Sequence, residues 1–246
     1  MNRIDVLGVG IDDLTREEAV ERALRLIGEH RSAYMVTPNP EIVMAAWDSD
    51  EVRRAIENAD LVIPDGTGVI MAARILGTPL RERMPGIDVA GDIMKRLSQS
   101  GGTVYLLGAR PGVAEKAAEN ITTLYPGLTV CGYRDGYGTD EAETVDSINA
   151  AGPDFVLVCL GASRQELWMA RNAPKLRVGL MAGLGGTLDV LSGEVKRAPE
   201  SWQRLQLEWL YRCLIEPKRF KKTLKFPHFI LKALRERAGK ESNGKG

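Results

Sequence analysis

Cysteine and histidine are scarce in this 246-residue chain, which limits the metal and disulfide chemistry open to it. The three cysteines, Cys131, Cys159 and Cys213, are odd in number, widely spaced and flanked by apolar residues. This pattern favours buried thiols in a reducing, cytoplasmic compartment over a disulfide framework. The two histidines, His30 and His228, supply almost no material for a His/Cys zinc site or a histidine-based triad. We therefore expect neither kind of site.

Long hydrophobic runs are also missing. No uninterrupted apolar stretch approaches the roughly 18 residues that a membrane-spanning helix needs. The opening segment, "MNRIDVLGVGIDDLT", carries acids where a signal peptide needs an apolar run. We therefore expect a chain that is neither exported nor threaded through a bilayer. Its 44% hydrophobic content is enough for one sizeable core.

The chain has no net charge either, but this neutrality is a cancellation. Residues 196–246 hold 14 Lys and Arg against 5 Asp and Glu, whereas residues 1–195 hold 19 against 28. We interpret residues 1–195 as the core and residues 196–246 as a basic, amphipathic C-terminal appendage.

Within residues 1–195, short runs rich in Val, Ile, Leu and Tyr alternate with longer segments of helical period. This alternation predicts βαβ units, and therefore an α/β fold around a largely parallel sheet. The expected strands are residues 3–11, 32–38, 59–64, 103–108 and 154–161. The expected helices are residues 14–30, 40–59, 68–77, 111–126 and 164–176, the first opened by a capping box of Thr15 and Glu18.

Ligands of open parallel sheets bind outside the carboxyl ends of the strands, where loops lead into helices. We therefore expect the functional residues in these loops. They are residues 37–40, 64–68, 108–112, 161–165 and 183–187.

Asp65 is the lone acid of its loop, between Pro64 and Gly66. It suits a helix cap and a reactive carboxylate equally well, with Gly66 and Gly68 freeing space around it. Asn39 before Pro40 is typical of an N-cap followed by a first-turn proline.

Three further loops are open to more than one interpretation, the last of them also as a simple tight turn from strand to helix. Ser163 and Glu166 have the spacing of a second capping box, with Gln165 as a first-turn residue. The turn from Gly108 to Gly112 is not a G-x-G-x-x-G dinucleotide fingerprint, yet a glycine-rich turn before a helix can offer backbone N–H groups to a phosphate. Three glycines at 183–186 allow a ligand close to the backbone, and Asp189 can accept bonds from a base or sugar.

The tail interleaves aromatic and basic residues. Six of the chain's 14 aromatic residues lie there: Trp202, Trp209, Tyr211, Phe220, Phe226 and Phe229. Apolar groups on one face with Lys and Arg on the other predict short helices in an anionic membrane interface, punctuated by Pro217 and Pro227. A solvated basic helix pair and a nucleic-acid-binding surface are the alternatives, and the strong apolar content argues against the solvated helices.

Several motifs together resemble those of the WecG/TagA/CpsF glycosyltransferase family. They are "TPNPEIV", "IPDGTGV", "YLLGARPGVAEKAAENI", "CLGASRQELWM", "GLGGTLDVLSGEVKRAP" and "LEWLYRCLIEPKRF", in family order, from about residue 3 to residue 230. The resemblance implies an inverting, metal-independent transferase without a cofactor. Such enzymes move a sugar, typically N-acetylmannosamine, from a UDP donor to N-acetylglucosamine on undecaprenyl diphosphate, often for wall teichoic acid. Relatives transfer N-acetylmannosaminuronic acid or glucose instead.

The resemblance also implies a Rossmann-like catalytic core and a C-terminal helical appendage that docks on the inner face of the cell membrane. By motif, Asp65 resembles the catalytic base, with Thr37 and Asn39 around the donor sugar and acceptor and Gln165 as another pocket residue important for activity. Residues matching the nucleotide cleft are Gly108, Gly136, Tyr137, Gly186 and Asp189. Arg212 and Arg219 match arginines over the diphosphate, and Lys222 stands where another arginine is often found, as a point charge. We expect no nucleic-acid partner; an oligomer and a non-catalytic, membrane-docked scaffold that binds nucleotide sugars remain open.

Overall fold

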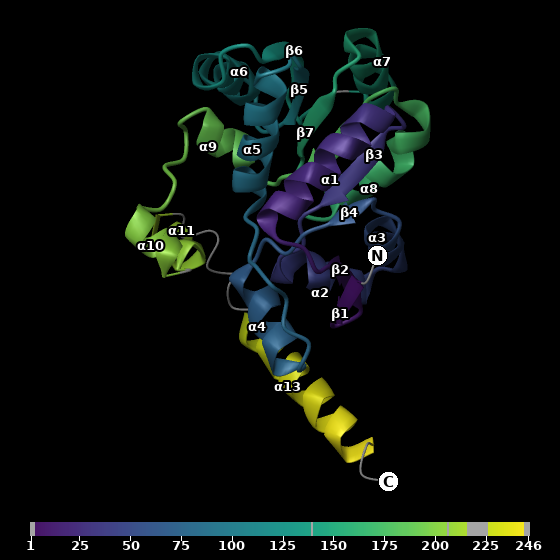
Figure 1. The fold of residues 1–246 in the computed structure, drawn as a ribbon, viewed down its shortest axis with the longest axis vertical. Helices are drawn as coiled ribbons and strands as arrows, with labels where there is room; N and C mark the ends of the chain where they lie inside the picture. The colour runs from purple at the N-terminus through teal and green to yellow at the C-terminus, as the bar shows by residue number, and fades with distance from the viewer. Residues whose placement is uncertain (1–2, 139, 206, 216–225, 244–246) are drawn as a thin grey trace.

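A six-stranded parallel sheet forms the centre of the molecule in a computed structural model that describes residues 3–138, 140–205, 207–215 and 226–243 (Figure 1). The strand order is β4-β3-β8-β7-β5-β6, and every neighbouring pair is parallel. The strands are β3 (Ala33–Val36), β4 (Leu61–Val62), β5 (Thr103–Gly108), β6 (Thr129–Arg134), β7 (Phe155–Cys159) and β8 (Leu180–Gly183). The predicted α/β class with a parallel sheet is confirmed.

Helices cover both faces of this sheet, which explains why its inner strands are apolar throughout. β3, β7 and β8 are buried at every position. One apolar cluster joins the sheet to α1 (Arg16–Glu29), α5 (Gly86–Ser98), α6 (Val113–Leu124) and α9 (Thr187–Leu191). The other cluster joins it to α2 (Pro40–Asp48), α3 (Asp50–Glu57), α4 (Thr67–Ile75), α7 (Glu141–Ala151) and α8 (Arg164–Asn172), which the short 3-10 helix η1 (Ala173–Lys175) follows.

The N-terminal segment differs from the single strand predicted over residues 3–11. It forms an antiparallel hairpin of β1 (Arg3–Val6) and β2 (Val9–Asp12), separate from the main sheet. Leu7 and Gly8 make the turn with φ angles of 57° and 87°, as a two-residue hairpin turn requires. The one-strand prediction is wrong because leucine gives no sign of a left-handed backbone.

The predicted helix over residues 40–59 is also interrupted. Ser49 has an extended backbone, with φ −146° and ψ 113°, and its side chain accepts a hydrogen bond from the backbone N–H of Val52. It therefore ends α2 and caps α3. The capping box of Thr15 and Glu18 is confirmed at the start of α1.

Cys159 is the most deeply placed thiol of the described residues. It is 5% exposed at the end of β7, and burial raises its pKa to about 12. Cys131 is half-buried in β6, and burial raises the pKa of its thiol too. Both are free thiols, as predicted, and the side chain of Cys213 lies outside the described residues.

The described part of the tail contains α10 (Glu200–Arg204), α11 (Glu208–Ile215) and α13 (Phe226–Asn243). Figure 1 shows α13 running along α4 and away from the sheet, with α10 and α11 beside the lower end of α5. Phe229 of α13 is fully buried and stacks on Trp47 of α2, with ring centroids 5.8 Å apart. The Nζ of Lys232 lies 4.0 Å from the centroid of the same Trp47 ring. Part of the tail therefore belongs to the hydrophobic core.

Within the described ranges, no helix combines the length and hydropathy needed to cross a bilayer.

Candidate active site

The carboxyl ends of all six strands share one edge of the sheet, because the strands all run in the same direction. The predicted site residues follow that edge in sheet order: Asp65 after β4, Thr37 and Asn39 after β3, Gly186 after β8, Gln165 after β7, Gly108 at the end of β5, and Gly136 and Tyr137 after β6. The expectation that these loops open on one edge is confirmed.

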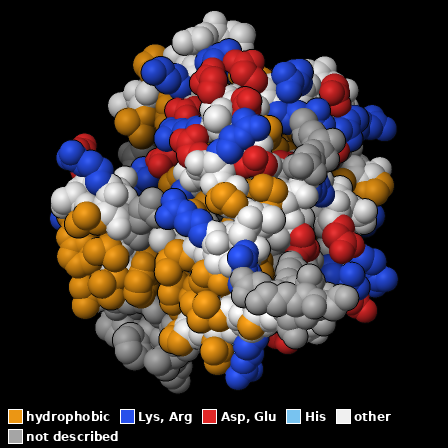
Figure 2. All heavy atoms as spheres, turned by 60° about the horizontal axis from the view of Figure 1, so that its bottom comes forward, with side chains coloured by type: hydrophobic (Ala, Val, Ile, Leu, Met, Phe, Trp, Pro, Cys, Tyr) orange, Lys and Arg blue, Asp and Glu red, His pale blue; other side chains and the backbone are white. Residues whose placement is uncertain are grey.

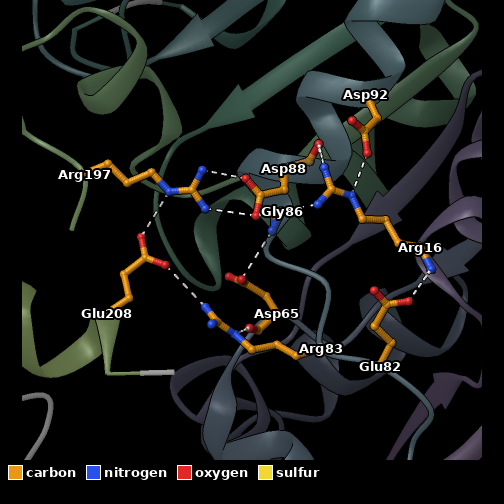
Figure 3. A network of polar contacts seen from close by, with 9 residues as sticks. All are labelled: Arg16, Asp65, Glu82, Arg83, Gly86, Asp88, Asp92, Arg197 and Glu208. Carbon is orange, nitrogen blue, oxygen red and sulfur yellow. Dashed lines mark hydrogen bonds and ion pairs between the residues drawn. The ribbon is translucent and has the colours of Figure 1, made fainter. Parts of the chain in front are cut away.

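Asp65 does not cap the helix that follows it. The N-cap of α4 is Gly66, which makes no side-chain cap bond. The Oδ1 of Asp65 instead accepts a hydrogen bond of 3.2 Å from the backbone N–H of Gly86, the first residue of α5. The Nε of Arg83 donates to the carbonyl oxygen of Asp65 at 2.9 Å (Figure 3). The carboxylate therefore lies at the positive end of a different helix, which stabilises its charge.

The glycines beside Asp65 allow close packing of neighbouring elements. A Cβ on Gly66 would lie 2.7 Å from the ring of Pro40, and one on Gly68 would lie 2.6 Å from the rings of both Pro40 and Phe226. A larger residue at either position would collide with the start of α2 or α13, and both glycines line the cavity beside the carboxylate.

Asn39 and Thr37 both have structural partners at the end of β3. The Oδ1 of Asn39 accepts hydrogen bonds from the backbone N–H groups of Glu41 and Ile42 at 2.9 and 3.1 Å, which confirms the predicted cap. Its side chain also lines the cavity described below. Thr37 is only 4% exposed, and its hydroxyl donates to the carbonyl of Gly183 in β8 at 2.7 Å.

Gln165 is buried at the start of α8 and reaches the loop after β8. Its Oε1 accepts from the backbone N–H of Gly185 at 2.9 Å, and its Nε2 donates to Glu166 at 2.8 Å. Thr37 and Gln165 thus hold the end of β8 from the two neighbouring strands. The predicted capping box of Ser163 and Glu166 is wrong: Ser163 has φ 67° and makes no side-chain cap bond, and Glu166 points into the interior.

Glu166 is a fully buried carboxyl group whose Oε2 has no hydrogen-bond partner. Burial raises its pKa from the ordinary value of 4.5 to about 7, and the hydrogen bond from Gln165 opposes the rise. The folded protein therefore keeps a proton that the unfolded chain has lost, so between about pH 4.5 and 7 the free energy of unfolding falls as pH rises.

Glu166→Gln is expected to remove this contribution, which amounts to about 3 kcal/mol at most. The amide keeps the shape of the protonated acid and cannot ionise. Urea unfolding at pH 5 and pH 7.5 measures the effect as the difference between variant and parent. Glu143→Gln, whose parent carboxyl is 70% exposed, is the control. If the free energy of unfolding had the same pH dependence in the parent, Glu166→Gln and Glu143→Gln, Glu166 would be ionised in the folded state.

A cavity of about 260 Å³ opens beside Asp65. Its walls come from the starts of α2, α4 and α5, from the loop after β8, and from the tail. The lining residues on which the argument depends are Asn39, Asp65, Arg83, Glu208, Trp209 and Phe226. The cavity therefore combines residues from the first third and the last fifth of the chain.

A network of charged side chains borders this cavity (Figure 3). Arg83 and Arg197 both face Glu208, at 3.4 and 3.6 Å. Arg197 also binds both carboxylate oxygens of Asp88, at 2.6 and 2.9 Å, and Arg16 approaches Asp88 and bonds to Asp92 on the same helix. The first turns of α5 are thereby tied to the tail.

Among the predicted nucleotide residues, Gly108, Gly136 and Tyr137 lie toward the β6 edge, whereas Gly186 lies between the cavity-lining residues Leu184 and Thr187. A side chain at Gly108 would collide with the carbonyl oxygen of Cys159, so the turn requires glycine. The backbone N–H of Gly136 donates to Ala109, and Tyr137 is 61% exposed. Gly186 is the N-cap of α9 and Asp189 lies in its first turn, packed beside α6.

The side chains of the three predicted basic residues of the tail lie outside the described residues. Arg212 lies in α11, but its side chain is outside the described residues. Arg219 and Lys222 lie outside the described residues altogether. Among the residues that are described, no group of three or more His, Cys, Asp or Glu side chains has an arrangement that could hold a metal ion.

Arg83, Gly86 and Glu208 line the cavity but were not among the predicted site residues, and Trp209 was predicted only as an aromatic residue of the tail. Pro85-Gly86 before an apolar periodic segment is a helix-start signal, and it could have placed a sixth loop in the site. Glu208 carries no such signal, because its core partner, Arg83, is 125 residues distant along the chain.

Comparisons with known proteins cover nearly the whole chain. A model described as "Glycosyl transferase WecG/TagA/CpsF family" matches residues 4–243, a range that includes the Asp65 loop and helix α13. The chain is 36% identical over 213 residues to a Bacillus spizizenii protein, covering 86% of this chain and 83% of the relative. It is 34% identical over 233 residues to a Staphylococcus aureus protein, covering 94% and 91%. Both relatives are named N-acetylglucosaminyldiphosphoundecaprenol N-acetyl-beta-D-mannosaminyltransferase.

Proposed function

The chain belongs to the WecG/TagA/CpsF glycosyltransferase family, and from this premise we propose that it transfers N-acetylmannosamine from UDP-N-acetylmannosamine to undecaprenyl-diphosphate-linked N-acetylglucosamine. The observation that carries the proposal is the shared name of relatives that are 34–36% identical over most of their length. The product is a lipid-linked disaccharide for wall teichoic acid or a related surface polysaccharide.

The proposed reaction is a single displacement that inverts the configuration at the anomeric carbon of the donor sugar, and it uses no metal. The acceptor hydroxyl attacks that carbon, its proton passes to the carboxylate of Asp65, and the bond from the sugar to the UDP oxygen breaks. Asp65 supports this role because it lines the cavity as a carboxylate held at a fixed place by Gly86. General-base help of this kind contributes about 10² to 10⁴ in rate.

Negative charge develops on the departing UDP and needs positive groups nearby. Arg83 lines the cavity and is one such positive group, and the N-terminus of α5, with its partial positive charge, faces the same cavity. We assign Arg212, Arg219 and Lys222 of the tail to the diphosphate as well. The nucleotide is proposed to lie along the remaining strand ends, over Gly108, Gly136, Tyr137, Gly186 and Asp189. Thr37, Asn39 and Gln165 are proposed to shape the sugar site next to Asp65.

The proposed division of labour gives catalysis to residues 1–195 and membrane docking on the inner face to residues 196–246. Figure 2 shows hydrophobic side chains gathered on the face that carries the tail helices. The exposed large apolar residues of the described tail support docking: Leu205, Trp209, Leu214, Leu231 and Leu234. Such side chains, with a net excess of Lys and Arg, suit the interface of an anionic bilayer.

Replacing Leu231 and Leu234 together by glutamate is expected to weaken binding to anionic vesicles by at least about tenfold, because each leucine buried in lipid contributes about 1.5–3 kcal/mol. The two side chains are 44% and 51% exposed and lie three residues apart, on one face of α13. Sedimentation with vesicles of phosphatidylglycerol and phosphatidylcholine measures binding. Leu124→Glu, at a 61% exposed site on α6, is the control. Equal binding by both variants would place the docking surface elsewhere.

The decisive test of the proposed function is a transfer assay with several UDP-sugars against one lipid-linked N-acetylglucosamine acceptor. UDP release that needs both UDP-N-acetylmannosamine and acceptor is the expected result. Preference for UDP-N-acetylmannosaminuronic acid or UDP-glucose would reassign the donor. Binding of a nucleotide sugar without acceptor-dependent release would indicate a membrane-docked scaffold instead of an enzyme.

A further inference from the structure

Glu208 is a buried acid placed between Arg83 of the core and Arg197 at the start of the tail. It is 6% exposed, and its two carboxylate oxygens point in different directions. Oε2 lies 3.4 Å from Nη2 of Arg83, and Oε1 lies 3.6 Å from Nε of Arg197 (Figure 3). Glu208 thus contacts one segment of the core and the segment that joins the core to the tail helices.

Each of these arginines is fixed by a second contact. Arg83 donates to the backbone carbonyl of Asp65, and Arg197 binds both oxygens of Asp88 in the first turn of α5. The contacts made by Arg83 and by Arg197 are linked to each other, because the backbone N–H of Gly86, the first residue of α5, donates to the carboxylate of Asp65. Glu208 therefore closes a ring of polar contacts that contains the proposed base.

Glu208 is also the first residue of α11, and Trp209 follows it into the cavity wall. The Trp209 ring stacks on Phe226 with centroids 5.6 Å apart and planes 17° from parallel. Phe226 in turn packs against Gly68 at the start of α4. The position of Glu208 therefore fixes the start of α11 and the position of the Trp209–Phe226 wall, the pair of stacked rings that lines the cavity.

We propose that Glu208 is a positioning residue that locks α11 and the Trp209–Phe226 wall over the site through Arg83 and Arg197. The proposal rests on the proposed function. The wall belongs to the acceptor side, because Trp209 is 38% exposed and the neighbouring exposed residues of the tail, Leu205 and Leu214, are apolar. The lock thereby governs access of the lipid-linked acceptor more than binding of the nucleotide.

The test compares Glu208→Gln with Glu200→Gln in the full-length chain. Gln keeps the shape and removes the charge, which leaves two partly buried guanidinium groups without their shared anion. Glu200 forms an ion pair with Arg204, but its side chain is 86% exposed, so its loss matters little. Kinetics give the KM values for donor and acceptor, and hydrogen exchange reports the amides of residues 207–215.

For Glu208→Gln we expect the acceptor KM to rise about tenfold or more and exchange in α11 to accelerate similarly, with a donor KM close to the parent's. Glu200→Gln should match the parent in every measurement. Arg197→Gln should reproduce the effect, and the double variant should cost less than the two single effects combined, as expected for residues in contact.

Three results would overturn the proposal: an unchanged acceptor KM in Glu208→Gln, a raised KM without faster exchange in α11, or faster exchange throughout the sheet. Loss of the proposed function is distinguishable from these outcomes. If the parent protein shows no transfer, the assigned reaction is wrong, and exchange in α11 still decides whether Glu208 locks the helix.

Discussion

Asp65→Asn is expected to lower the transfer rate by about 10² to 10⁴ while the protein stays folded. Asparagine keeps an oxygen in the place that accepts the N–H of Gly86, so the link between the Asp65 loop and α5 survives. The amide cannot take up the proton of the acceptor hydroxyl. The change therefore isolates proton removal from packing, and the KM of the donor should stay near the parent's.

Steady-state transfer with UDP-N-acetylmannosamine and a lipid-linked acceptor measures this effect. Asp146→Asn, an exposed position on α7, is the matched control and should leave the rate unchanged. Near-normal turnover of Asp65→Asn would remove Asp65 from the role of base. A loss of folding, seen as a lower unfolding midpoint, would show that the carboxylate charge is needed at the N-terminus of α5.

Phe229→Ala is expected to lower the free energy of unfolding by about 3–5 kcal/mol, the cost of deleting a buried aromatic ring and leaving a cavity. Phe229 is fully buried and stacks on Trp47, although it lies in a tail whose sequence predicts a membrane-docking segment. A large loss of stability is therefore expected even in the absence of any membrane.

Urea unfolding in detergent-free buffer measures this loss. Leu234→Ala, at a 51% exposed site on the same helix, should change the free energy of unfolding by less than about 0.5 kcal/mol. Similar stabilities for Phe229→Ala and the parent would mean that α13 leaves the core in solution. The comparison therefore decides how far the tail is part of the folded domain.

The sheet and one edge of the site were predictable because they rest on local patterns. Apolar runs such as residues 155–159 are buried on both faces and read as strands, and parallel strands bring Asp65, Thr37 and Asn39 to the same edge. The cap at Asn39 follows from two adjacent residues, and the structure confirms it.

The remaining features depend on backbone angles or distant contacts that no local pattern encodes. The positive φ of Leu7 makes a hairpin where alternation predicted one strand, and that of Ser163 removes an expected capping box. The partner of the Asp65 carboxylate is a helix start 21 residues further along, and the wall over it comes from the tail. Tertiary contacts of this kind override local preference.

The distance along the chain between the two halves of the cavity also sets an order of events during synthesis. Arg83 and Glu208 are 125 residues apart, which corresponds to roughly 6–25 s of translation at about 5–20 residues per second. During that interval Gly68 and Trp47 lack the Phe226 and Phe229 rings that later cover them. The cavity beside Asp65 therefore gains its tail wall only after Glu208, Trp209 and Phe226 have left the ribosome.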